Sequence, residues 1–70
     1  IVLRSLSNLE KLNLAGCMQI TPEALLEIGN LKKLNDLNLS STQTNDQVLL
    51  EVPPNLVFLN LKNCQRVMGG

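Results

Sequence analysis

The sequence lacks histidine, tryptophan and tyrosine and contains a single phenylalanine. Without histidine it has neither the commonest general base nor the commonest metal ligand of proteins. Six Lys and Arg residues balance six Asp and Glu residues, so the basic charge typical of nucleic-acid-binding proteins is missing. No apolar run approaches the roughly 18 residues of a membrane span. We therefore expect no enzyme, no cofactor, no metal site, no nucleic-acid partner and no membrane partner.

Leucine, in contrast, is abundant and regularly placed, with 16 of the 70 residues. The pattern L-x-x-L-x-L-x-x-C/T occurs three times, starting at Leu9, Leu34 and Leu56, which are 25 and 22 residues apart. Each copy has Leu-Asn before its third leucine. Leucines that alternate with asparagine predict a short strand with leucine on one face and asparagine on the other. Three such copies predict a repeat architecture.

The segments between these strands carry signals for short helices. Thr21 is suited to cap a helix that begins at Pro22, and Gly29 is suited to end it. Asn45 is suited to cap a weaker helix over Asp46 to Val52, which a Pro-Pro pair ends. We expect one or two turns there, of α or 3-10 type.

The first repeat resembles the cysteine-containing subclass of leucine-rich repeats, as found in F-box proteins. It reads L-x-x-L-x-L-x-x-C-x-x-I-T, with Leu9, Leu12, Leu14, Cys17, Ile20 and Thr21 at the defining positions. The second repeat departs from this pattern, with Thr42 for Cys and Thr44 for Ile. The resemblance implies an α/β leucine-rich-repeat solenoid. Its parallel strands would form the concave face, and short helices or 3-10 turns the convex face.

The repeats divide the chain into one segment of a solenoid, residues 1–70. Residues 1–8 fit the tail of a preceding repeat, 9–33 and 34–55 form two repeats, and 56–70 begin a partial one. Neither end carries the polar cap of a terminal repeat. We expect a piece of a longer array that, in isolation, is marginally stable or associates with itself.

The two cysteines, Cys17 and Cys64, are predicted to be structural. Strands about 4.8 Å apart place them about 10 Å from each other, beyond the roughly 7 Å between Cα atoms that a disulfide allows. Without a close third ligand they form no metal site. We expect both thiols, and the Thr42 hydroxyl at the equivalent position, to turn inward and bind loop backbone. Reduced cysteines suit an intracellular, cytoplasmic protein.

The outward side chains of the predicted sheet are the candidate binding residues. Asn13, Asn38 and Asn60 form a row whose amides can bond to one another along the sheet, present donors and acceptors to a partner, or do both. Phe58, the only aromatic residue, takes an outward position and is predicted to be an exposed anchor. An inward Phe58 would require a register slip that misplaces both neighbouring leucines.

Three charged residues also belong to the candidate binding residues. Lys11, Asp36 and Lys62 neighbour the asparagine row and are expected to set charge complementarity. We expect the concave sheet to bind another protein, and the resemblance implies substrate recognition in an F-box-type ubiquitin ligase as the most concrete version. The alternative is a structural spacer in a larger immune receptor, effector or regulatory scaffold, packed against neighbouring repeats.

Overall fold

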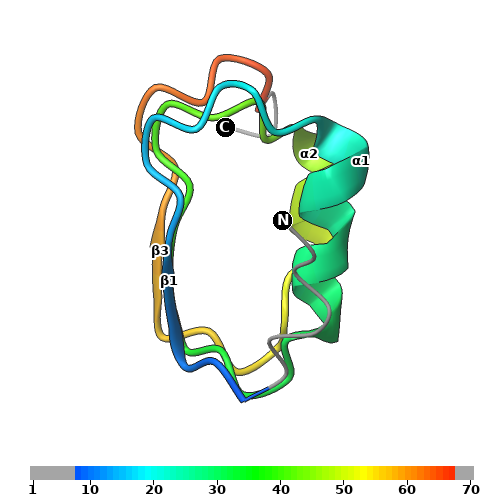
Figure 1. The fold of residues 1–70 in the computed structure, drawn as a ribbon, viewed down its shortest axis with the longest axis vertical. Coiled ribbons are helices and arrows are strands. Elements are labelled where there is room, and N and C mark those ends of the chain that lie inside the picture. Colours follow the sequence, from blue (N-terminus) through cyan, green and yellow to red (C-terminus); the bar gives the residue numbers. More distant parts are fainter. Residues whose placement is uncertain (1–7, 68–70) are drawn as a thin grey trace.

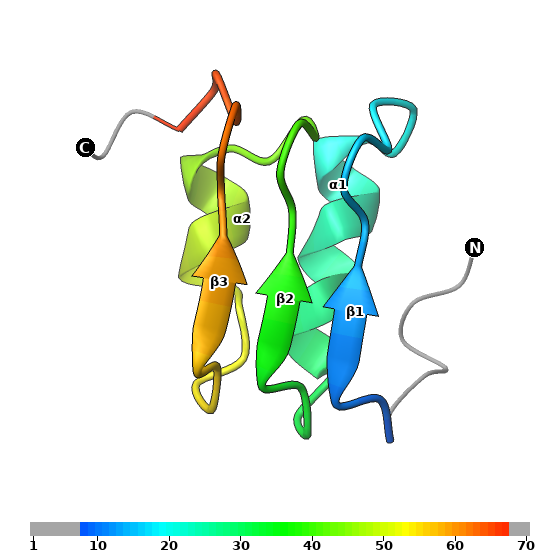
Figure 2. The ribbon, with the colours of Figure 1, turned by 90° about the vertical axis from the view of Figure 1, so that its left-hand side faces the viewer.

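The computed structural model describes residues 8–67. In this range the elements are β1 (Lys11–Asn13), α1 (Pro22–Leu25), the 3-10 helix η2 (Leu26–Asn30), β2 (Asp36–Asn38), α2 (Asp46–Leu50) and β3 (Phe58–Asn60). The strands form a parallel sheet in the order β1-β2-β3, and the helices lie on one side of it (Figures 1 and 2). The fold is therefore α/β. Most of the predicted tail of a preceding repeat, and residues 68–70 of the partial repeat, lie outside the described residues.

The register of the sheet follows the alignment of the three repeats. It pairs Lys11 with Asp36 and Phe58, Leu12 with Leu37 and Leu59, and Asn13 with Asn38 and Asn60. Equivalent positions therefore form rows that cross the strands. A slip of one residue would exchange the two faces of a strand, so the buried leucines specify this register.

Both predicted helix caps are present. The Oγ1 atom of Thr21 accepts a hydrogen bond from the Ala24 N–H at 3.2 Å, and Oδ1 of Asn45 accepts one from the Val48 N–H at 3.0 Å. These side chains satisfy backbone donors that the first turn of a helix leaves without a partner. The second helix is α-helical and, at Asp46–Leu50, shorter than predicted.

The prediction that Gly29 ends the first helix is wrong. The α-helical part ends at Leu25, and 3-10 geometry continues through Gly29 to Asn30. Glycine is required there for a different reason. A Cβ atom at this position would lie 2.5 Å from the backbone oxygen of Glu51, so only glycine allows this approach to the segment that follows α2.

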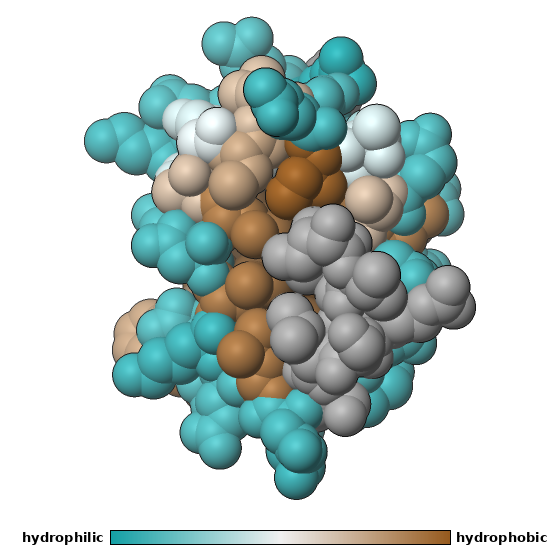
Figure 3. All heavy atoms as spheres, viewed as in Figure 1, coloured by the Kyte–Doolittle hydropathy of each residue, from teal (hydrophilic) through white to brown (hydrophobic). Residues whose placement is uncertain are grey.

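The core lies between the sheet and the helices. Eight apolar residues there are buried, namely Leu14, Leu25, Ile28, Leu31, Leu34, Leu37, Leu39 and Val48. Figure 3 shows apolar residues gathered between the two layers, with polar residues around them. Each of the three repeats contributes leucines to this shared layer. A single unit therefore cannot bury its apolar side chains without its neighbours.

A left-handed turn follows each strand. Gly16, Ser41 and Asn63 occupy the same position of successive repeats and have φ angles of 80°, 55° and 64°. Backbone hydrogen bonds continue across the repeats at this level, from the Gly16 N–H to the Ser40 oxygen at 2.9 Å and from the Ser41 N–H to the Lys62 oxygen at 2.8 Å. The turns are thus held in the same register as the strands.

Candidate functional site

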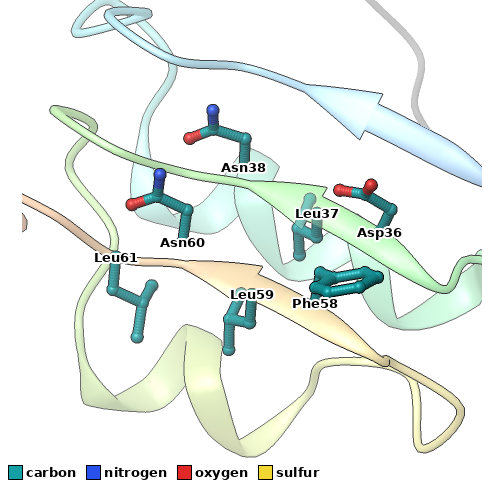
Figure 4. A pocket seen from close by; sticks show the side chains of 7 residues that line it. All are labelled: Asp36, Leu37, Asn38, Phe58, Leu59, Asn60 and Leu61. Atoms are coloured by element: carbon teal, nitrogen blue, oxygen red, sulfur yellow. The ribbon is translucent and has the colours of Figure 1, made fainter.

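The sheet has one face that points away from the helices, which we term the open face. Its outward residues are Lys11, Asn13, Asp36, Asn38, Phe58 and Asn60. Figure 4 shows the four of these that belong to β2 and β3 on the opposite side of the sheet from Leu37, Leu59 and Leu61. The alternation of side chains along each strand therefore separates the core from the open face.

Two shallow hollows adjoin on the open face. One lies over β2 and β3, where its outward lining residues are Asp36, Asn38, Phe58 and Asn60 (Figure 4). The other lies over β1 and β2, where its outward lining residues are Lys11, Asn13, Asp36 and Asn38. Because Asp36 and Asn38 line both hollows, the predicted binding residues of the three strands form one continuous surface.

The oxygen of each asparagine in this row is already used within its own repeat. Asn13, Asn38 and Asn60 accept hydrogen bonds through Oδ1 from the backbone N–H two residues ahead, in Ala15 at 2.9 Å, Ser40 at 3.0 Å and Lys62 at 2.9 Å. A backbone N–H can only donate, so the atom that faces it must be the amide oxygen. Each of the three bonds closes a local turn at the end of its strand.

The structure does not show the alternative in which the amides bond to one another along the row. Among residues 8–67, no hydrogen bond joins Asn13, Asn38 and Asn60, and none of their Nδ2 groups has an acceptor. In Figure 4 the nitrogens of Asn38 and Asn60 point away from the sheet. The row therefore presents amide donors to its surroundings, while its acceptors face the turns.

Phe58 is exposed on the open face, as the sequence predicted. Its side chain has 66% of its surface accessible, and its ring lies beside Asp36 (Figure 4). Leu59 points towards the helix side, also as predicted, yet it is 40% exposed. Its counterpart Leu37 on the central strand is 1% exposed, because β2 has a strand on both sides.

The three predicted charged residues lie at two levels of the sheet. Lys11 and Asp36 share a row with Phe58, whereas Lys62 follows β3, two residues beyond Asn60. Both lysines are exposed, and Asp36 is half-buried. The structure thus gathers Lys11, Asp36 and Phe58 on one side of the asparagine row and places Lys62 after it.

The buried polar side chains stabilise the loops that follow the strands in the chain. Cys64 donates through Sγ to the backbone oxygen of Leu39 at 3.0 Å, and Thr42 donates through Oγ1 to the same oxygen at 2.7 Å. Both side chains therefore turn inward onto loop backbone. Cys17 and Cys64 are free thiols, and Cys17 is half-buried.

Thr44 has a structural role that the sequence reasoning did not assign. It is fully buried, and its hydroxyl lies 2.8 Å from that of Thr42. A signal for this pair existed in the sequence, because the second repeat replaces both Cys and Ile of the first repeat with Thr. Two polar replacements in one apolar layer are tolerated when they bond to each other.

Within the described range, no group of three or more Cys, Asp or Glu residues is arranged to hold a metal ion. None of the helices in that range combines the length and the apolar character that crossing a membrane requires. No family model, curated protein or solved structure matches the chain.

Proposed function

We propose that the chain is a protein-binding repeat module that holds its partner on the open face, with Phe58 as the apolar anchor. The exposure of Phe58 at the hollow over β2 and β3, which adjoins the hollow over β1 and β2, is the observation that carries this proposal. A large aromatic ring in water gains free energy when a partner covers it, and aromatic residues are enriched at the centres of interfaces. The neighbouring Asn38 and Asn60 would then orient the partner through hydrogen bonds.

We further propose that the chain is a segment of a leucine-rich-repeat solenoid of the cysteine-containing subclass, with the open face as its concave side. Its support is the leucine spacing together with one parallel strand in each of the three repeats and a helical segment in each of the two full repeats. On this assignment, substrate recognition in an F-box-type ubiquitin ligase is the most concrete version of the function. The inward thiol of Cys64 fits a reduced, intracellular protein.

A random peptide display library tests the main proposal. The 70-residue chain is immobilised, bound peptides are recovered, and each is measured against Phe58→Ala and Leu50→Ala. Leu50 is a matched control, because it is 79% exposed and lies on α2, away from the open face. We expect peptides whose affinity falls at least tenfold with Phe58→Ala and stays unchanged with Leu50→Ala. Recovery of no such peptide would refute the proposal.

A second candidate function, a structural spacer, is favoured by the flank of β3. Val57 and Leu59 are 71% and 40% exposed, and among the described residues no strand pairs with the outer edge of β3. Such a flank suits a further unit of the same kind, supplied by a neighbouring repeat or a second copy of the chain.

Sedimentation velocity separates the spacer from the binding module. If the flank is the functional surface, the chain associates with rising concentration, and Val57→Lys abolishes the association whereas Phe58→Ala does not. A chain that stays monomeric at all concentrations tested speaks against stacking by a second copy.

A further inference from the structure

We infer that the open face selects an acidic segment of a partner protein, in which one apolar residue lies beside a short run of Asp or Glu. This inference rests on the proposed function, because it names the class of partner for the same face. It follows from the balance of hydrogen-bond donors, acceptors and charges on that face.

The asparagine row offers a ligand more free hydrogen-bond donors than acceptors. In all three residues Oδ1 accepts a hydrogen bond from the chain itself, at 2.9 to 3.0 Å. An amide group carries two N–H donors on its nitrogen, so the row presents up to six donors to a ligand. A ligand rich in acceptors satisfies them, and carboxylates are the strongest acceptors that a protein offers.

The charges on and next to this face act in the same direction. On the open face itself, the exposed Lys11 and the half-buried Asp36 carry opposite charges. Lys62 is exposed and follows the asparagine row two residues beyond Asn60, so it adds one positive charge next to this face, and the three residues together carry a net positive charge. Exposed charges of one sign attract a ligand of the opposite sign, and they suppress binding of ligands of the same sign.

The spacing of the strands sets the length of the ligand. Neighbouring strands lie about 4.8 Å apart, so the three asparagines span about 10 Å, which about three residues of extended peptide cover. Phe58 lies on β3, two residues before Asn60, and offers an apolar contact at one end of that span. A single apolar residue followed by two or three acidic residues fits this arrangement.

Replacing asparagine with aspartate tests the donors without disturbing the turn. In Asn38→Asp one carboxylate oxygen still accepts the hydrogen bond from the Ser40 N–H, while the outward donors are replaced by a negatively charged oxygen that can only accept. Asn60→Asp makes the same change on the edge strand and serves as a second variant. Asn30→Asp is the matched control, because Asn30 is exposed on η2, on the helix side of the sheet.

The probes are three fluorescent 12-residue peptides with one leucine followed by three Glu, three Gln or three Lys. Fluorescence anisotropy is measured with the unchanged chain, the three Asp variants and Phe58→Ala. We expect the Glu peptide to bind at least tenfold more tightly than the Gln peptide, and the Lys peptide not to bind. Asn38→Asp and Asn60→Asp should each weaken the Glu peptide at least tenfold, and Asn30→Asp less than twofold.

The outcomes distinguish this inference from the proposed function. If peptides bind in a Phe58-dependent manner but the Gln or Lys peptide binds as tightly as the Glu peptide, the inference fails and the proposed function stands. Equal weakening by Asn38→Asp and Asn30→Asp also overturns the inference, since overall charge then decides the affinity. If neither these peptides nor a display library yields Phe58-dependent binding, the proposed function itself fails.

Discussion

The different burial of two equivalent leucines predicts different costs for the same substitution. Leu37 and Leu59 are paired in the sheet, but Leu37 is 1% exposed and Leu59 is 40% exposed. Leu37→Ala leaves a cavity with strands on both sides, and such substitutions cost about 2–5 kcal/mol. Leu59→Ala removes a side chain from an open flank, where no closed cavity remains. Only part of the transfer free energy is lost there, roughly 1 kcal/mol.

These costs have to be compared with the stability of so small a chain. A single core of this size rarely supplies more than about 3–5 kcal/mol. We therefore expect Leu37→Ala to leave the chain largely unfolded at 25 °C, whereas Leu59→Ala still folds. With a slope of about 1 kcal/mol per molar urea, the midpoint of Leu59→Ala should fall by about 1 M. Urea titrations followed by far-ultraviolet circular dichroism measure both values.

The titrations are repeated at two protein concentrations, because a partner on the flank of β3 would hide its exposure. Equal costs for Leu37→Ala and Leu59→Ala, independent of concentration, would refute the reasoning. Leu59 would then be as enclosed as Leu37, and β3 would not be an edge strand. A cost for Leu59→Ala that rises only with concentration indicates that a second copy covers this flank.

Three further substitutions test the close contacts and turns by urea denaturation. Gly29→Ala should destabilise the chain by about 1–3 kcal/mol, because its Cβ atom would lie 2.5 Å from the Glu51 oxygen. Ser41→Gly should stabilise it by about 0.5–1 kcal/mol, since the φ angle of 55° is strained for serine. Thr42→Val should cost about 1–3 kcal/mol, because the buried Leu39 oxygen and Thr44 hydroxyl both lose a hydrogen-bond partner.

Each of these substitutions has a matched control and a contrary result. Asn30→Ala lies beside Gly29 and should be nearly neutral, so a Gly29→Ala variant as stable as Asn30→Ala contradicts the close approach. Ser40→Gly should destabilise, in contrast to Ser41→Gly, because Ser40 does not have a positive φ angle. Thr42→Ser keeps the hydroxyl and should cost less than Thr42→Val. Equal costs for the two Thr42 variants would attribute the effect to packing.

The leucine spacing made the sheet predictable because it combines two periods. The alternation places Leu37 and Leu39 on one face of the sheet and Asn38 on the other, and the distance between repeats aligns the strands. The caps Thr21 and Asn45 were predictable for a similar reason, since each makes a local bond within three residues. Features carried by the repeat pattern itself or by a local hydrogen bond were thus accessible from the sequence.

Contacts between segments far apart in the chain were not accessible in this way. Glycine is typical of a helix end, but the role of Gly29 depends on the approach of Glu51, 22 residues later. The 3-10 geometry of Leu26–Asn30 likewise depends on how that segment packs. Leu59 obeys the same pattern as Leu37, and its exposure follows only from its place at the edge of the sheet. Such effects arise from tertiary packing, which local patterns do not encode.

The asparagine row shows why a structural and a binding interpretation of one residue need not compete. The turn uses only Oδ1 of Asn38, which accepts from the Ser40 N–H, and Ser41 then takes the left-handed conformation. The amide nitrogen is fixed by that bond and, in Figure 4, points away from the sheet. A donor held in one orientation loses less entropy when a ligand binds than a freely rotating side chain does. The turn therefore orients the donor, so Asn38→Ala would remove both functions, whereas Asn38→Asp removes only the outward one.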